Sequence, residues 1–102
     1  MESLALSGNS IVVIPKALGQ LKNLKYLALN NNKIDCVLPK SLNNLTKLEG
    51  IYLFNNVDIR GETLTQPSLQ SCDYNVGNNK SENGICVAEN TSCTTFTGIQ
   101  PC

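Results

Sequence analysis

The sequence contains no histidine and carries no net charge, because eight basic side chains balance eight acidic ones. The chain therefore lacks the most common general base and the most common metal ligand, and we expect neither a metal nor a cofactor. Neutrality argues against nucleic acid as the main partner. The longest aliphatic run, Ile11-Val12-Val13-Ile14, is far shorter than the roughly 20 residues that cross a bilayer. No basic segment followed by an apolar secretory leader is visible after Met1.

Leucine is absent from the last third of the chain, and cysteine is nearly absent from the rest. All fourteen leucines lie at or before Leu69, whereas four of the five cysteines lie from Cys72 onward. A chain of 102 residues is long enough for one small domain. The composition therefore divides one domain into a leucine-containing part, residues 1–69, and a cysteine-containing part, residues 70–102.

The leucine-containing part repeats itself. A shift of 23 residues places Leu4, Leu6, Asn9 and Ile11 on Leu27, Leu29, Asn32 and Ile34. A shift of 24 places Pro15, Leu18, Leu21 and Leu24 on Pro39, Leu42, Leu45 and Leu48, and also Leu27, Leu29 and Asn32 on Ile51, Leu53 and Asn56. These matches predict about three units, approximately residues 1–23, 24–47 and 48–71.

Each unit combines two hydrophobic periods. Apolar residues alternate around Leu27, which is typical of a half-buried strand. After Pro15 and Pro39 the apolar spacing changes to three, which favours a 3-10 or loosely helical segment with one buried edge. Because a single unit cannot bury its own leucines, the units must stack into a solenoid with parallel strands.

The block Leu24-x-x-Leu27-x-Leu29-x-x-Asn32-x-Ile34 resembles the leucine-rich-repeat pattern, and the resemblance covers about residues 1–69. The tract from Asn32 to Leu48 is most similar to the 24-residue form of plant, fungal and amoebozoan extracellular proteins. The resemblance implies an α/β fold: a short right-handed solenoid with strands on a concave face and 3-10 or loop returns on a convex face. It also implies a ladder of asparagine side chains that bond the backbone of their own and adjacent turns, here Asn9, Asn32 and Asn56.

The third unit departs from the pattern. With the same shift of 24, Ile34 falls on Asp58 between two apolar residues, which indicates a turn slipped by one residue. Leu45 falls on Leu69 and Leu48 falls on Cys72, so we expect the cap to begin in the position of a core leucine. At the other end no polar cap precedes the first core leucine, and we expect the chain to be N-terminally incomplete or covered by a partner.

Cys72, Cys86, Cys93 and Cys102 predict a disulfide-bonded C-terminal cap. The segment has too few apolar residues to fold around its own core, and the close cysteine pairs of structural zinc sites are absent. Four cysteines allow three pairings, which sequence cannot decide; of these we favour Cys72 with Cys86 and Cys93 with Cys102. Cys36 is expected to be a small, partly buried hydrophobe, since no histidine is present to activate it.

Three N-x-[ST] sequons mark glycosylation candidates at Asn44, Asn79 and Asn90. Composition alone predicts about two such triplets, so their number decides little. Asn44 falls on the outward edge of a predicted convex return, where a glycan would not block the sheet.

The variable positions between the leucines of the strands would face outward from the sheet. As ligand-binding candidates we select Lys25, Tyr26, Asn30, Glu49, Tyr52 and Phe54. Tyrosine and phenylalanine are favoured in interfaces, although the same rings can simply cover neighbouring strands. The charges on this face form no acid/base pair, so we do not expect an enzyme. The resemblance implies an extracellular or cell-surface interaction module, or part of a receptor-type ectodomain, that recognises a protein, peptide or glycan; the alternative is a structural spacer without a ligand.

Overall fold

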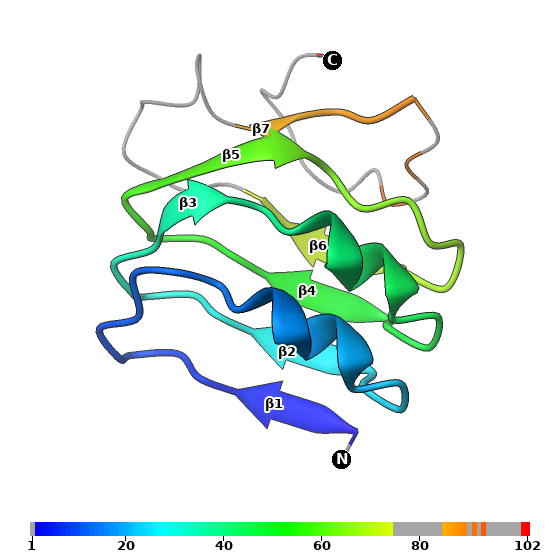
Figure 1. Ribbon diagram of the computed structural model, residues 1–102, viewed down its shortest axis with the longest axis horizontal. Helices are drawn as coiled ribbons and strands as arrows, with labels where there is room; N and C mark the ends of the chain where they lie inside the picture. The colour runs from blue at the N-terminus through cyan, green and yellow to red at the C-terminus, as the bar shows by residue number, and fades with distance from the viewer. Residues whose placement is uncertain (1, 75–84, 90, 92, 94–100) are drawn as a thin grey trace.

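The computed structural model describes residues 2–74, 85–89, 91, 93, 101 and 102. Within them, four parallel strands form one sheet in the order β1-β2-β4-β6 (Figure 1). The strands are β1 (Ser3–Ala5), β2 (Tyr26–Ala28), β4 (Gly50–Tyr52) and β6 (Ser71–Asp73). The predicted solenoid of stacked parallel strands is thereby confirmed.

The return from each of the first two strands contains a short 3-10 helix, as the spacing of three predicts. These are η1 (Lys16–Gln20) and η2 (Lys40–Asn44), which begin directly after Pro15 and Pro39. The fixed φ of proline suits the residue that precedes the first helical turn. The two helical turns, blue and green in Figure 1, lie one above the other on the same side of the molecule.

A second parallel sheet, which the sequence did not lead us to expect, lies at the turn side of the strands. It contains β3 (Asp35–Val37), β5 (Asp58–Glu62) and β7 (Ile85–Cys86) in that order. Asp58 stands opposite Asp35 and not opposite Ile34, in keeping with the one-residue slip in the third unit. Cys36 stands opposite Ile59; it is a free, partly buried thiol that packs against the core.

The core consists of the repeated aliphatic residues of the middle units. Those with no exposed surface are Leu24, Leu27, Leu29, Ile34, Leu42, Leu45, Leu48, Ile51 and Leu53. Burial of one such side chain stabilises a fold by about 1.5–3 kcal/mol. The packing of this stack, and not local helix or strand propensity, therefore holds the short elements in place.

The first three strands of the four-stranded sheet, β1, β2 and β4, each lead into a turn with a left-handed residue at the same position. Gly8, Asn31 and Asn55 occupy equivalent positions and have φ values of 75°, 59° and 57°. Glycine and asparagine are the residues that tolerate this conformation best. The asparagine pair adds a bond between units, because Asn55 Nδ2 donates to Asn31 Oδ1 at 2.8 Å.

The next residue of each turn is the asparagine of the predicted ladder. Asn32 Nδ2 donates to the carbonyls of Leu29 and, in the preceding unit, Leu6, both at 3.0 Å. Its Oδ1 accepts the amide of Ile11 at 3.1 Å. Asn56 repeats these contacts one unit later, bonding Leu29 O at 3.1 Å and accepting the amide of Ile34 at 3.0 Å. Asn9 bonds only inside its own turn, to the carbonyls of Leu6 and Ser7.

The expectation that Cys72 takes the position of Leu48 is wrong. In the sheet register Cys72 stands opposite Ile51, so the last unit is 21 residues long and Leu69 is the equivalent of Leu48. The unit is shorter because it turns at residues 67–68 without a 3-10 helix. Residues 71–73, which we assigned to the cap, therefore form the fourth strand of the solenoid sheet.

The favoured disulfide pairing is also wrong. Cys72 pairs with Cys93, and Cys86 pairs with Cys102. Cys72 lies in β6 of the four-stranded sheet whereas Cys86 lies in β7 of the three-stranded sheet, so the pairing we favoured would have to join the two sheets. Cys102 reaches Cys86 because its amide donates to the carbonyl of Val87 at 3.0 Å.

Candidate functional site

The candidate site is the open face of the four-stranded sheet, meaning the side chains that alternate with the buried leucines. The strand register defines it as two rows that cross the strands. The rows are Ser3, Tyr26, Gly50 and Ser71, and Ala5, Ala28, Tyr52 and Asp73. Tyr26 is 44% exposed, and Tyr52 is half-buried.

Tyr26 is held by a neighbouring carboxylate. Its hydroxyl donates to Glu49 Oε1 at 3.2 Å, across the gap between β2 and β4. This hydrogen bond and the negative charge of Glu49 raise the pKa of Tyr26 above its ordinary value. Loss of the phenol proton is thus disfavoured by Glu49, and Tyr26 and Glu49 form one hydrogen-bonded pair on the open face.

Tyr52 lies over the backbone of its own strand. Its hydroxyl donates to Ser71 Oγ at 3.0 Å in β6. A Cβ atom at Gly50 would lie 2.7 Å from that hydroxyl and 3.0 Å from Cδ1 of Tyr26. A side chain at position 50 would therefore displace the tyrosine side chains, which share the space above Gly50. Two aromatic side chains and their bonded hydroxyls form a continuous surface over β2, β4 and β6.

The remaining predicted binding residues lie around this surface. Lys25 precedes β2 and is half-buried, as are Asn30 and Phe54, which follow β2 and β4. The backbone carbonyls of Asn30 and Phe54 accept bonds from the turns of the preceding units, from the amides of Gly8 and Asn31. Their positions make them the border of the open face on the side where the strands end.

Sequence reasoning missed Ser71 and Asp73, which β6 adds to the open face. The signal was present, because Leu69-x-x-Cys72-x-Tyr74 matches Leu48-x-x-Ile51-x-Leu53 at a shift of 21. The shift of 24 that relates the two preceding units does not produce this match. Ser71 anchors Tyr52, so the missed strand completes the aromatic surface.

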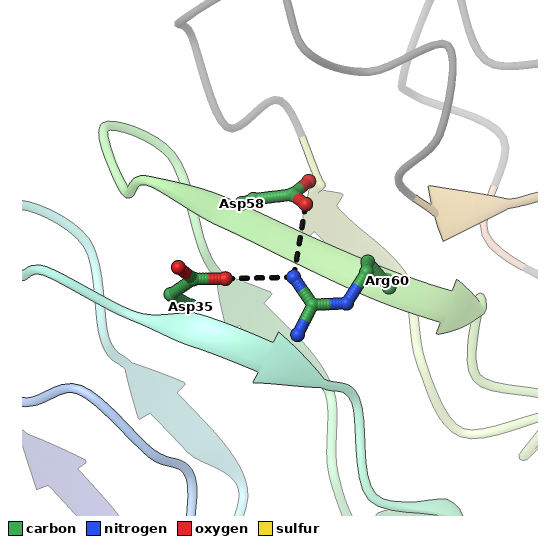
Figure 2. Close-up of polar contacts among 3 residues, drawn as sticks. All are labelled: Asp35, Asp58 and Arg60. Atoms are coloured by element: carbon green, nitrogen blue, oxygen red, sulfur yellow. Dashed lines mark hydrogen bonds and ion pairs between the residues drawn. The ribbon is translucent and has the colours of Figure 1, made fainter.

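The second sheet carries a cluster of charges away from the open face. Arg60 of β5 places Nη1 at 2.7 Å from Asp35 Oδ1 and 2.9 Å from Asp58 Oδ2 (Figure 2). Hydrogen bonds to Asp35 and then Asp58 raise the pKa of Arg60 above its ordinary value. Asp35 belongs to β3, so the cluster joins two neighbouring strands. Arg60 thus links the carboxylates of the two strands through Nη1, while the other oxygen of Asp58, Oδ1, is buried without a hydrogen-bond partner among the described residues.

Of the glycosylation candidates only Asn44 lies within the described residues; Asn79 and Asn90 lie outside them. Asn44 is the exposed last residue of η2 and lines a shallow hollow between the two 3-10 helices. This places it on the helical side of the molecule, apart from the open face.

Comparison with known proteins agrees with the stacked strands and the asparagine turns. A family model described as "Leucine rich repeat" matches residues 1–57. The chain belongs to the leucine-rich-repeat family. Receptor like protein 27 from Arabidopsis thaliana is 34% identical over 77 residues, which cover 72% of this leucine-rich-repeat chain and 10% of that protein. The chain thus spans a small part of the length of this relative. No solved structure matches the chain.

None of the helices in the described part of the chain is long and apolar enough to cross a bilayer.

Proposed function

We propose that this leucine-rich-repeat chain is a non-enzymatic interaction module of receptor type that recognises a protein or peptide through its open face. The observation that carries the proposal is the pair Tyr26 and Tyr52, whose rings flank Gly50 and whose hydroxyls are held by Glu49 and Ser71. Rings fixed before binding lose little conformational entropy when a ligand packs on them. Family membership and the likeness to a plant receptor-like protein support the same function.

The size of the face favours a peptide or a single loop as its ligand. Four strands at a spacing of about 4.8 Å span roughly 15 Å. A standard protein interface needs about 800 Å² on each partner. A peptide that crosses the strands can contact one side chain from each of them, whereas a flat protein surface would have to extend beyond this sheet. A glycan ligand stacked on the tyrosines is the second possibility.

We also propose an extracellular or cell-surface location, with glycosylation at Asn44. Two disulfides are stable in an oxidising compartment and are rare in the cytosol. A glycan on Asn44 would extend from the helical side of the molecule and leave the open face free.

The function is tested by selection from a randomised linear peptide library displayed on phage. We expect enriched peptides to bind the wild-type chain and to lose about tenfold or more in affinity when Tyr26 or Tyr52 is changed to alanine, as hot-spot residues do. Val37→Ala is the matched control, because Val37 is 59% exposed on the other sheet. Circular dichroism and thermal midpoints would show whether each variant is still folded.

The spacer alternative predicts the opposite result. If no peptide is enriched, or if enriched peptides bind the Tyr26→Ala and Tyr52→Ala variants as well as the wild type, the open face is not the recognition surface. Stacking of an oligosaccharide on the tyrosine rings would be revealed in a glycan array by binding to the wild type that is lost in the same two variants.

A further inference from the structure

Positive and negative side chains are separated on this molecule. The helical side, meaning residues 15–24 and 39–48 with η1 and η2 at their centre, contains four lysines and no acidic residue (Figure 1). The lysines are exposed, and they are Lys16, Lys22, Lys40 and Lys47. Carboxylates belong instead to the two sheets and the residues beside them, among them Asp35, Glu49, Asp58, Glu62 and Asp73. A chain without net charge thus has one basic side.

The charges of these lysines are poorly neutralised within the described part of the chain. Lys40 Nζ lies 3.8 Å from Glu62 Oε2, but the two side chains are 81% and 48% exposed, and such surface pairs are weak. None of the described residues forms an ion pair with Lys16 or Lys22. Lys16 and Lys40 are the first residues of two stacked helical turns, so like charges are neighbours and repel each other. Contacts inside the described structure therefore do not account for this arrangement.

A hollow between η1 and η2 brings two of the lysines together with uncharged polar groups. Its volume is about 330 Å³, at the lower end of the range for small-molecule sites. Lys16, at the start of η1, and Lys22, just after its end, both line the hollow. The exposed amide side chains of Gln20 and Asn44 line it as well, and neither is used in a hydrogen bond to another described residue. Cations and available hydrogen-bonding groups thus meet in one recess.

The residue types of the helical side favour one class of anionic ligand over the others. This side contains no aromatic residue and no arginine, which are the usual anchors of protein interfaces and, for aromatic rings, of single-stranded nucleic acids. The exposed large hydrophobic side chains of the described residues all lie outside it, whereas binding to a membrane surface combines lysines with buried apolar area. A polysaccharide needs neither kind of anchor, because amide groups bond its hydroxyls and lysines attract its acidic groups.

We propose that the helical side binds an anionic polysaccharide and that the hollow holds one of its acidic sugar residues. Lys16 and Lys22 contact the carboxylate or sulfate of that residue, since an ammonium group pairs with either anion as a point charge. Gln20 and Asn44 bond its hydroxyls, and the other two lysines attract acidic groups further along the polymer. The inference does not rest on what the open face binds. A glycan on Asn44 would compete for the same hollow.

The proposal is tested by binding of the chain to immobilised polygalacturonate, which carries carboxylates, and to immobilised dextran sulfate. Uncharged dextran is the control polymer, and every chain carries Thr46→Ala, which removes the sequon and keeps Asn44. We expect binding to one or both charged polymers and none to dextran. Binding should weaken several-fold between about 50 mM and about 200 mM salt, because salt screens exposed charges. The preferred polymer shows whether the acidic group is a carboxylate or a sulfate.

Charge reversal at single lysines locates the binding surface. Lys16→Glu and Lys22→Glu should each weaken binding by roughly tenfold. Lys33→Glu is the matched control, because it makes the same change at an exposed lysine outside the helical side, and it should leave the affinity within about twofold. Circular dichroism confirms that each variant is folded. Equal losses in all three variants, or no binding of the unmodified helical side to either charged polymer at low salt, would overturn the proposal.

The remaining anionic partners are tested in the same assay. Polyglutamate represents an acidic polypeptide, and phosphatidylcholine vesicles that contain phosphatidylserine represent an anionic membrane. We expect both to bind more weakly than the better of the two polysaccharides, since the helical side offers no aromatic, arginine or exposed large apolar anchor. Tighter binding of either one would identify a different class of ligand and overturn the proposal.

Discussion

At the scale of single residues, the last strand shows how one side chain replaces another in a leucine stack. Tyr74 stands where Leu53 and Leu29 stand in the preceding units and is 1% exposed. A buried phenol needs a hydrogen-bond partner, and its oxygen accepts the amide of Leu64 at 3.0 Å. Tyr74 therefore fills a core position and also satisfies a backbone group of the shortened unit.

Burial of Tyr74 predicts a loss of stability in alkaline solution. Desolvation of the phenolate raises the pKa of Tyr74 from 10.0 to about 12, against a smaller opposite effect of the bond from Leu64. Because the folded pKa lies above the unfolded one, the contribution to stability is complete below pH 10 and is lost as the pH rises towards 12. The pKa difference corresponds to roughly 2–3 kcal/mol.

The measurement is the urea midpoint at about pH 8 and about pH 11, a range in which the unfolded phenol of Tyr74 ionises. Lysine side chains lose protons in the same range, so the alkaline decline of each variant is compared with that of the wild type. We expect Tyr74→Phe to remove much of the alkaline loss, although it leaves the Leu64 amide unpaired at a cost of about 1–3 kcal/mol at neutral pH. Tyr26→Phe is the control, since Tyr26 is exposed and its loss should leave the alkaline decline in place. An alkaline decline that persists in Tyr74→Phe would contradict the assignment.

At the scale of elements, the regular units were predictable and the shortened one was not. The spacing of three after Pro15 and Pro39 predicted η1 and η2, because a buried leucine edge in this spacing is a strong signal. In the third unit the core position equivalent to Leu45 is occupied by Gln66, a polar residue that gave no hydrophobic signal. Gln66 is 4% exposed, and its Nε2 donates to the carbonyls of Leu42 and Leu45.

These carbonyls lie at the end of η2, where they also accept the backbone amides of Leu45 and Leu48. The glutamine amide thus replaces a third 3-10 helix by bonding directly to the end of the second. The sequence alone could not decide the length of the third unit. A period of 24 aligns Leu69 with Leu45, and a period of 21 aligns it equally well with Leu48. The shorter unit depends on the hydrogen bonds of the Gln66 side chain, and only the shorter unit places Ser71 and Asp73 in the candidate site.

The close approach of η1 and η2 gives a prediction at this scale. A Cβ atom at Gly19 would collide with the backbone carbonyl of Ser41 in η2. The equivalent residue of the next unit is Asn43, whose Oδ1 accepts the amide of Thr65 at 2.9 Å, because no helix follows there. A side chain is therefore tolerated at position 43 but not at position 19.

We expect Gly19→Ala to lower the free energy of unfolding by about 1–3 kcal/mol, the range for an overpacked contact that must move backbone. Gln20→Ala is the matched control, because Gln20 is an exposed neighbour on the same helix. Urea denaturation of both variants measures the difference. Equal midpoints for Gly19→Ala and the wild type would mean that the two helical turns can separate without loss.

At the scale of the whole molecule, each sheet ends in a strand that a disulfide connects to the cap. Cys72 in β6 ends the four-stranded sheet, and Cys86 in β7 follows β5 in the three-stranded one. Side chains add to this attachment, since Thr63 Oγ1 accepts the amide of Ala88 and Thr91 Oγ1 donates to the carbonyl of Leu64. The composition was enough to predict a disulfide-bonded cap. The cysteine pairing was not predictable, because it depends on which sheet each cysteine joins and the three-stranded sheet was not predicted.

The two disulfides should contribute unequally to stability, although they close loops of similar length, with sequence separations of 21 and 16. Loop closure alone predicts about 3 kcal/mol for each. Cys72 and Cys93 are 5% and 1% exposed, so their removal also leaves a cavity in the core, whereas Cys86 is half-buried and Cys102 is exposed. We expect the double alanine variant of Cys72 and Cys93 to have the lower urea midpoint of the two double variants. Peptide mapping with alkylation, on protein made through the secretory pathway, should first find both pairs oxidised and Cys36 as the free thiol. If the variant of Cys86 and Cys102 were instead the less stable one, covalent closure of the three-stranded sheet would matter more than packing behind β6.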